Sequence, residues 1–246
     1  MQKLLRRSVA IAATAGLTLA LAVPAAAGST RTYEVTIQLV TGGQPLTPPL
    51  IATHSGGTGI FSVGQPASFG VKEIAENGNL GPLIAALEAD PKVSHFVAAG
   101  APKPLVPPGS PMSGTLSDEV TLTIDADPGA RFLSYASMLI CTNDGFTGID
   151  RLRLPNQVGD SLSVVTASYD AGTEVNTEDF ADIVPPCQPL MGVSSGESGT
   201  GMSDPALAEG GIIHHHPGIE GDVDDLQLDV HGWTDPVTLV TITRVG

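Results

Sequence analysis

The sequence is poor in aromatic side chains and in positive charge. Aromatic residues make up only 4% of the 246 residues, with a single Trp. No aromatic stripe is present, so Val, Leu, Ile and Ala must fill the interior. Lys and Arg number 11 against 26 Asp and Glu, a formal net charge of −15. This acidity argues against nucleic acid or an anionic lipid surface as partner through bulk electrostatics. Divalent cations, basic partners or simple solubility remain compatible with it.

Cysteine is scarce as well. Cys141 and Cys187 are the two cysteines, and they show no CxxC or Cys/His spacing typical of zinc or redox sites. In an exported chain an even number favours a disulfide, and two buried free thiols are the alternative. The disulfide would stabilise the fold by about 3–4 kcal/mol in the chain-entropy model.

One long apolar run is present, at the N-terminus. It has a basic start, an apolar centre and a small-residue end: Lys3, Arg6 and Arg7; residues 8–23; Ala25, Ala26 and Ala27. This pattern is typical of a signal peptide. A membrane anchor is the alternative, but the run is short for a span. We therefore expect cleavage after residue 27, no transmembrane anchor in the mature chain, and a secreted or periplasmic protein. Loss of three positive charges changes the formal charge from −15 to −18.

Alternating apolar and polar residues predict several strands. These strands are expected at residues 32–40, 93–99, 119–125, 131–141, 152–154, 163–169 and 237–245. Residues 68–89 predict two short helices separated by Asn77-Gly78, and residues 50–62 are expected to be irregular. The sequence shows neither a βαβ rhythm nor a fixed repeat. It predicts an all-β fold, an antiparallel β-sandwich with a short helical insertion, as one domain over residues 28–246.

An acidic stretch separates the two central β-rich runs. Residues 142–150 hold Asp144 and Asp150 among glycines, and the second run ends at Asp170, with Glu174 following. Oxygen ligands at strand ends, held in glycine-containing loops, suit a hard cation such as Ca²⁺. The alternative is that these are ordinary turn residues.

Four blocks carry a resemblance to a known family. They are residues 66–78, 143–152, 169–174 and 233–237. On these residues the chain resembles the spondin N-terminal domain family, a module of extracellular matrix proteins that is also found in bacterial secreted proteins. The resemblance implies an antiparallel β-sandwich similar to C2 domains, with a structural calcium ion bound at one end. It also implies a binding or cell-adhesion role, with an extracellular protein or glycan as the partner, rather than catalysis.

The resemblance also assigns the candidate calcium ligands. The positions that match the acidic residues of the family are Asp144, Asp150, Asp170 and Glu174, and Asp125 is placed to complete the set. The chain departs from the family at three nearby positions. Gly145 stands where animal members carry a Trp, and Arg151 and Arg153 stand where smaller or acidic residues are usual.

A histidine run supports a different hypothesis. Consecutive side chains alternate along a strand, so of residues 214–216 only His214 and His216 can face one ion. A secreted or periplasmic transition-metal-binding protein using these two is therefore the alternative function. The simpler interpretation of the histidine run is a polar loop. The acidic residues 222–229 are likewise best interpreted as a solvated loop. Residues 192–196 match Gly-x-Ser-x-Gly without the strand and helix of a nucleophile elbow, so we expect no enzyme.

Overall fold

The structure, a computed structural model, describes residues 28–100, 103–221 and 223–246. The predicted signal peptide lies outside these residues. The strands are β1 (Arg31–Leu39), β2 (Leu50–His54), β3 (Val93–Ala98), β4 (Glu119–Ala126), β5 (Phe132–Met138), β6 (Gly145–Arg153), β7 (Ser161–Thr166), β8 (Ser168–Asp170), β9 (His214–His215) and β10 (Thr238–Arg244). The helices are α1 (Phe69–Asn77), α2 (Gly81–Ala89), α3 (Cys187–Met191) and α4 (Leu228–His231).

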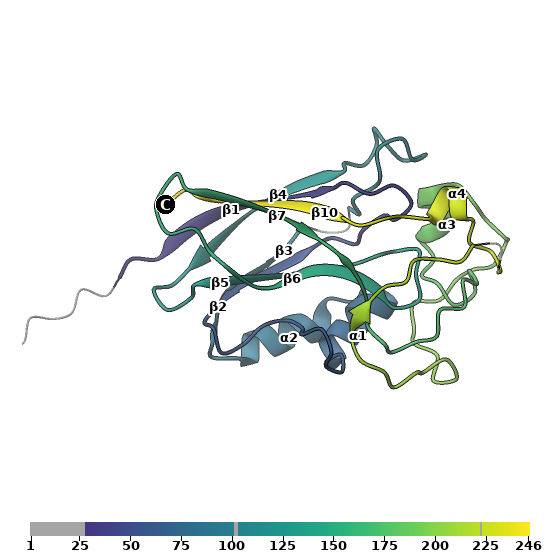
Figure 1. Ribbon diagram of the computed structural model, residues 1–246, viewed down its shortest axis with the longest axis horizontal. Coiled ribbons are helices and arrows are strands. Elements are labelled where there is room, and N and C mark those ends of the chain that lie inside the picture. The colour runs from purple at the N-terminus through teal and green to yellow at the C-terminus, as the bar shows by residue number, and fades with distance from the viewer. Residues whose placement is uncertain (1–27, 101–102, 222) are drawn as a thin grey trace, which may run out of the picture.

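The strands form two antiparallel sheets that pack face to face (Figure 1). One has the order β4-β1-β10-β7, and the other has the order β3-β2-β5-β6-β8-β9. One apolar cluster fills the space between the sheets, and a second lies between the six-stranded sheet and α1 and α2. The predicted all-β sandwich is confirmed, with a helical layer on one outer face.

Strand β1 shows why the sandwich forms. Its alternating residues Tyr33, Val35, Ile37 and Leu39 are all at most 1% exposed and face the other sheet. Because side chains alternate across a strand, the intervening polar residues point away from this core. The final strand β10 pairs with β1 on one side and β7 on the other, so its predicted central position is confirmed.

The helical region divides where the sequence predicted. Ser68 caps α1, its hydroxyl accepting a hydrogen bond from the Val71 amide at 3.2 Å. Gly78 ends that helix in the left-handed conformation, with φ of 62°. A close approach joins the two helices, because a Cβ on Gly70 would lie 2.8 Å from the Leu83 Cα.

The predicted acidic loop is largely a strand. Strand β6 begins at Gly145 and runs through Asp150, whereas the sequence predicted a strand only from residue 152. The glycines that suggested a loop have a packing role instead. A Cβ on Gly148 would lie 2.2 Å from the Tyr135 carbonyl oxygen on the neighbouring strand, so a glycine is required for this approach.

Two further expectations were wrong. The run at residues 163–169 is not one strand, because it divides at Ala167 into β7 of one sheet and β8 of the other. Residues 50–62 are not wholly irregular, since β2 occupies their first five positions. All five residues of β2 are buried, so the segment lacks the alternation that marks a half-exposed strand.

Among the described residues, no helix is both long and apolar enough to cross a membrane.

Candidate functional site

The turn between β5 and β6 and the end of β8 bring two predicted ligands together. The Thr142 hydroxyl donates to the Leu139 carbonyl at 2.7 Å and accepts from the Gly145 amide at 2.9 Å, which fixes the turn. Gly145 is the partner of Asp170 in the β6–β8 pairing. Asp144, one residue earlier, therefore lies beside Asp170 at the end of the six-stranded sheet.

Asp144 is a buried carboxylate with one oxygen paired and one unpaired. Its side chain is 0% exposed. Oδ2 accepts hydrogen bonds from the Thr173 amide at 2.7 Å, the Thr173 hydroxyl at 3.2 Å and the Glu174 amide at 3.1 Å. Oδ1 has no hydrogen-bond partner among the described residues. Buried polar atoms are normally satisfied, so this oxygen is a candidate ligand atom.

Asp170 is equally buried but better satisfied. Its Oδ1 accepts from the Gly172 amide at 2.7 Å, and its Oδ2 accepts from the Asn176 amide group at 2.8 Å. The His214 Nε2 lies 3.5 Å from Oδ1. These contacts hold the carboxylate in place at the start of the Asp170–Glu174 loop.

Burial and like charge act together on this site. Burial raises the pKa of Asp144 to about 7, and the neighbouring Asp170 charge adds to the shift. The pKa of His214 is raised by its hydrogen bond to the His215 carbonyl and by the charges of Asp170 and Asp144. Two carboxylates share a poorly solvated site, an arrangement that a bound cation would stabilise.

Glu174 approaches the site from a different direction. Its backbone amide contacts Asp144, but its own Oε1 accepts from the Asp204 amide at 3.2 Å. Burial raises the pKa of Glu174 to about 7, with smaller contributions from the charges of Glu76 and Asp144. Glu76 belongs to α1, where it pairs with Lys72 at 2.6 Å. Glu174 therefore lies between the Asp144 site and helix α1.

The structure does not bring Asp125 or Asp150 to this site. Asp125 lies opposite Thr32 at the start of β1, near the other end of the sandwich. Asp150 follows Gly145 by five residues on β6, about 15 Å along the strand, and pairs with Arg151 at 2.8 Å. A single ion, with ligands at about 2.3–2.6 Å, cannot contact all five predicted carboxylates.

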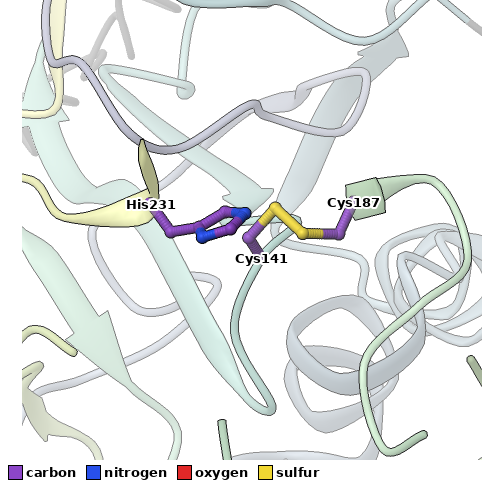
Figure 2. A group of neighbouring side chains, drawn as sticks. All are labelled: Cys141, Cys187 and His231. Atoms are coloured by element: carbon purple, nitrogen blue, oxygen red, sulfur yellow. A yellow bond between two sulfur atoms is a disulfide. The ribbon is translucent and has the colours of Figure 1, made fainter. Parts of the chain in front are cut away.

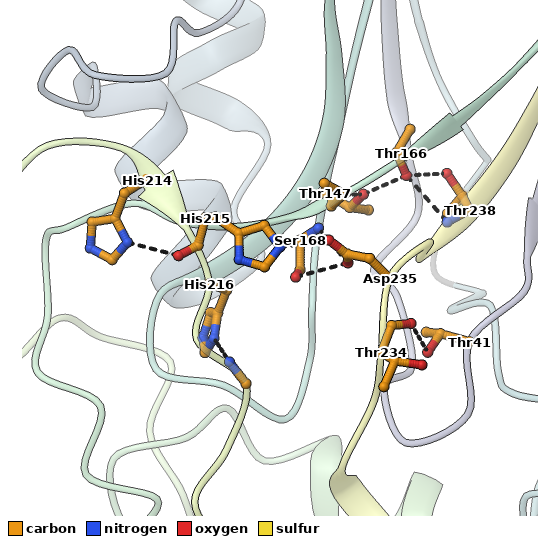
Figure 3. A network of polar contacts seen from close by, with 12 residues as sticks. Thr41, Thr147, Thr166, Ser168, His214, His215, His216, Thr234, Asp235 and Thr238 are labelled. Atoms are coloured by element: carbon orange, nitrogen blue, oxygen red, sulfur yellow. Dashed lines mark hydrogen bonds and ion pairs between the residues drawn. The ribbon is translucent and has the colours of Figure 1, made fainter.

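The histidine run forms a short edge strand with divergent side chains. His215 pairs with Asp235 at 2.7 Å (Figure 3), while the His214 Nε2 lies 3.5 Å from Asp170. His216 is buried against Trp233 with ring centroids 4.9 Å apart, and burial lowers its pKa to about 4. Its Nδ1 accepts from the Gly218 amide, so His216 and His214 have separate partners. Among the described residues, no set of three clustered metal-ligating side chains includes either of them.

A third acidic group was missed by the sequence analysis. Carboxylate oxygens of Asp179, Glu197 and Asp225 lie within 4.8 Å of one another. A hydrogen bond with Asp179 raises the pKa of Glu197. Asp225 belongs to the acidic residues 222–229, which we interpreted as a solvated loop. Residues 179, 197 and 225 are widely separated in sequence, so no local spacing indicated this group.

The two cysteines form the predicted disulfide. The Cys141–Cys187 bond joins the turn after β5 to helix α3, and both residues are buried (Figure 2). His231 of α4 lies beside it. Although these three side chains cluster, the sulfur atoms are bonded to each other and are not free thiolate ligands.

The Spondin_N family model matches residues 45–184, more than half of the chain. The chain belongs to the spondin N-terminal domain family. No curated protein matches it significantly. The matched region of this spondin domain contains the turn with Asp144, the loop from Asp170 to Glu174, and Cys141. Strands β1 and β10 and the histidine run lie outside it.

Family membership and the disulfide together indicate an extracellular protein. The Gly-x-Ser-x-Gly string of this spondin domain follows helix α3, which ends at Met191, rather than a strand. Its Ser194 hydroxyl donates to the Gln188 side-chain oxygen at 2.7 Å. This is not the strand–turn–helix of a nucleophile elbow.

Proposed function

We propose that this spondin domain is an exported binding or adhesion module with a structural Ca²⁺ at Asp144 and Asp170. The observation that carries the proposal is the unpartnered Oδ1 of a fully buried Asp144 beside a second buried carboxylate. Oxygen-only ligands favour Ca²⁺ over softer ions. We expect an extracellular protein or glycan as the partner, and an export signal over residues 1–27.

The proposed ion would have a mechanical role. Asp144 belongs to the β5–β6 turn, and Asp170 begins the loop after β8. Existing hydrogen bonds from Thr173 and Glu174 to Asp144 already join the two segments. A cation between the carboxylates would remove their repulsion and hold the same segments together, and the loops at this end would present a rigid surface to a partner.

The alternative function, transition-metal binding by His214 and His216, is supported less well. His214 lies near Asp170, and the buried His216 accepts from the Gly218 amide through Nδ1. The Nε2 of His216 is buried without a partner, but among the described residues neither histidine belongs to a cluster of three metal-ligating side chains. The expectation of a non-catalytic protein stays a prediction.

Thermal unfolding with EDTA or with Ca²⁺ tests the proposal. A ligand that binds only the folded state stabilises it by about 2.7 kcal/mol at a hundredfold excess over Kd. For a domain of this size, this corresponds to a rise in Tm of roughly 5–11 °C. We expect Ca²⁺ to give this rise, and Mg²⁺ to give less because it requires a tighter octahedral shell.

Two variants locate the ion. Asp144→Asn should have the same Tm in EDTA and in Ca²⁺. Asp150→Asn is the matched control, since it makes the same chemical change six residues and about 20 Å farther along the chain, and it should keep the full Ca²⁺ response. A wild-type Tm that is indifferent to EDTA and to millimolar Ca²⁺ would show that the buried carboxylates hold no ion.

A further inference from the structure

Four arginines line one cleft at the end of the sandwich away from α3 and α4. Figure 1 shows this end, where β1 begins and the C-terminus lies. The cleft has a volume of about 550 Å³. It is lined by Arg31, Arg131, Arg153 and Arg244, together with Gly28, Ser29, Pro128, Leu154 and Asn156.

The strand register places these arginines together although they are far apart in sequence. Arg31 begins β1, and Arg244 at the end of β10 pairs with Tyr33 of the same strand. In the other sheet, Arg153 ends β6 opposite Phe132, and Arg131 immediately precedes Phe132. Each sheet therefore contributes two arginines to the same cleft.

This concentration of positive charge is unusual for so acidic a chain. Of the 11 Lys and Arg residues, three lie in residues 1–27, and four of the remaining eight line this cleft. Among the described residues, the ion pairs of Lys and Arg are Lys72–Glu76 and Arg151–Asp150. In the described ranges, no Asp or Glu carboxylate forms an ion pair with an arginine of the cleft.

Two of the arginines are held by backbone carbonyls. Arg31 donates to the carbonyls of Asp127 and Ala130. Arg244 donates to the Asn156 carbonyl and to the main-chain oxygen of Gly246, which belongs to the negatively charged C-terminal carboxylate of the chain. Two carboxylates at this end of the sandwich have hydroxyl donors. Asp125 accepts from the Thr32 hydroxyl and Asp127 from the Thr30 hydroxyl.

The other two arginines are open to a ligand. The guanidinium groups of Arg131 and Arg153 make no hydrogen bond within the part of the chain that the structure describes, and both residues are exposed. An arginine presents a planar fork of donors that matches the oxygens of carboxylate, phosphate or sulfate groups. Four positive charges in one cleft also repel one another, and a bound anion would relieve this repulsion.

We propose that this cleft binds a ligand through a phosphate or sulfate group. The volume lies within the range of small-molecule sites. Tetrahedral oxyanions can accept from several arginines at once, which one carboxylate does less well. This proposal is independent of the calcium site, which lies at the other end of the strands.

Gly28 extends the argument to the processed chain. It is the first residue that the structure describes, and it lines the cleft. Cleavage after residue 27, as the sequence predicts, would create an α-amino group at Gly28. Such a group has a pKa of about 7.7–8.0 and is mostly protonated at pH 7, so processing would add a further positive charge beside the cleft.

Isothermal titration of the purified protein at low ionic strength tests the proposal. The probes are inorganic phosphate, inorganic sulfate, a sulfated disaccharide and the same disaccharide without sulfate. We expect binding of the anionic probes and none of the unsulfated sugar. If the sulfated disaccharide binds more tightly than inorganic phosphate and sulfate, the ligand is a phosphate or sulfate ester. If the inorganic ions bind more tightly, the ligand is a free oxyanion.

The double variant Arg131→Gln/Arg153→Gln should weaken anion binding at least about tenfold, since it removes charge-assisted hydrogen bonds. Both side chains are exposed and their removal lessens the repulsion in the cleft, so the Tm of the anion-free variant should be no lower than that of the wild type. Arg151→Gln is the control of the same residue type, because Arg151 pairs with Asp150 outside the cleft. The absence of binding for every anionic probe, or undiminished binding by the double variant, would overturn the proposal.

Discussion

Replacing Asp144 with Asn should stabilise the cation-free protein at alkaline pH. The wild-type carboxylate has a pKa raised to about 7 from its ordinary value of 3.8, chiefly by burial. Between these two values the folded state binds a proton that the unfolded state has released, so wild-type stability falls as pH rises through this window. The amide does not titrate, and its oxygen can still accept from Thr173 and Glu174.

The size of the effect follows from the pKa shift. One pKa unit corresponds to 1.36 kcal/mol, so the full window amounts to about 4 kcal/mol. More than half of it, roughly 2.5 kcal/mol, falls between pH 5 and pH 8. The advantage of Asp144→Asn over wild type should grow by that amount across this interval, and Ca²⁺ should remove it by stabilising the wild type alone.

Urea unfolding in EDTA at several pH values measures this difference. Comparing variant with wild type is essential, because other groups also titrate in this range. Glu174, whose pKa is also raised to about 7, acts in the same direction as Asp144. His216, whose pKa is lowered to about 4, acts in the opposite direction. A gap between Asp144→Asn and wild type that is equal at pH 5 and pH 8 would refute the inferred role of burial.

Two further predictions concern buried side chains. Replacing Cys141 and Cys187 with Ala should lower the free energy of unfolding by about 4 kcal/mol, because the disulfide closes a loop with a sequence separation of 46. Urea unfolding of the variant, and of the wild type with and without reductant, measures this loss. An unchanged urea midpoint would contradict the prediction. The free energy of unfolding of the wild type should also fall by about 3 kcal/mol between pH 6.5 and pH 4 because of His216. In this range His216 binds a proton in the unfolded state but not in the folded state. His216→Phe keeps a ring against Trp233 and should remove this loss, and an unaltered acid dependence would show that His216 is not its source.

The strands that alternate between core and surface could be predicted from the sequence. β1 and β4 have polar residues on one face, and their residues match the predicted ranges closely. β2 could not be found in this way because both of its faces are buried. The division between β7 and β8 depends on a tertiary contact, since the Asp235 carboxylate accepts hydrogen bonds from the amide and hydroxyl of Ser168.

The candidate cation site was predicted in part. The family resemblance pointed to Asp144 and Asp170, and strand pairing places them together. It also pointed to Asp150, which the strand character of β6 carries away from them. The arginine cleft left no local pattern at all, because its residues meet only through the register of four strands.

The separation of the two ends of the sandwich changes what the net charge means. The nine residues of β1 span about 30 Å, whereas the Debye length at physiological ionic strength is about 8 Å. The acidic group of Asp179, Glu197 and Asp225 lies beside α3 and α4, because Gln188 of α3 donates to the Glu197 carbonyl and Phe180 packs against His231 of α4. Mobile ions therefore screen its field before it reaches Arg131 and Arg153. An approaching anion therefore experiences the local charge of whichever end it meets. The exclusion of anionic partners that follows from a charge of −15 does not extend to the arginine end.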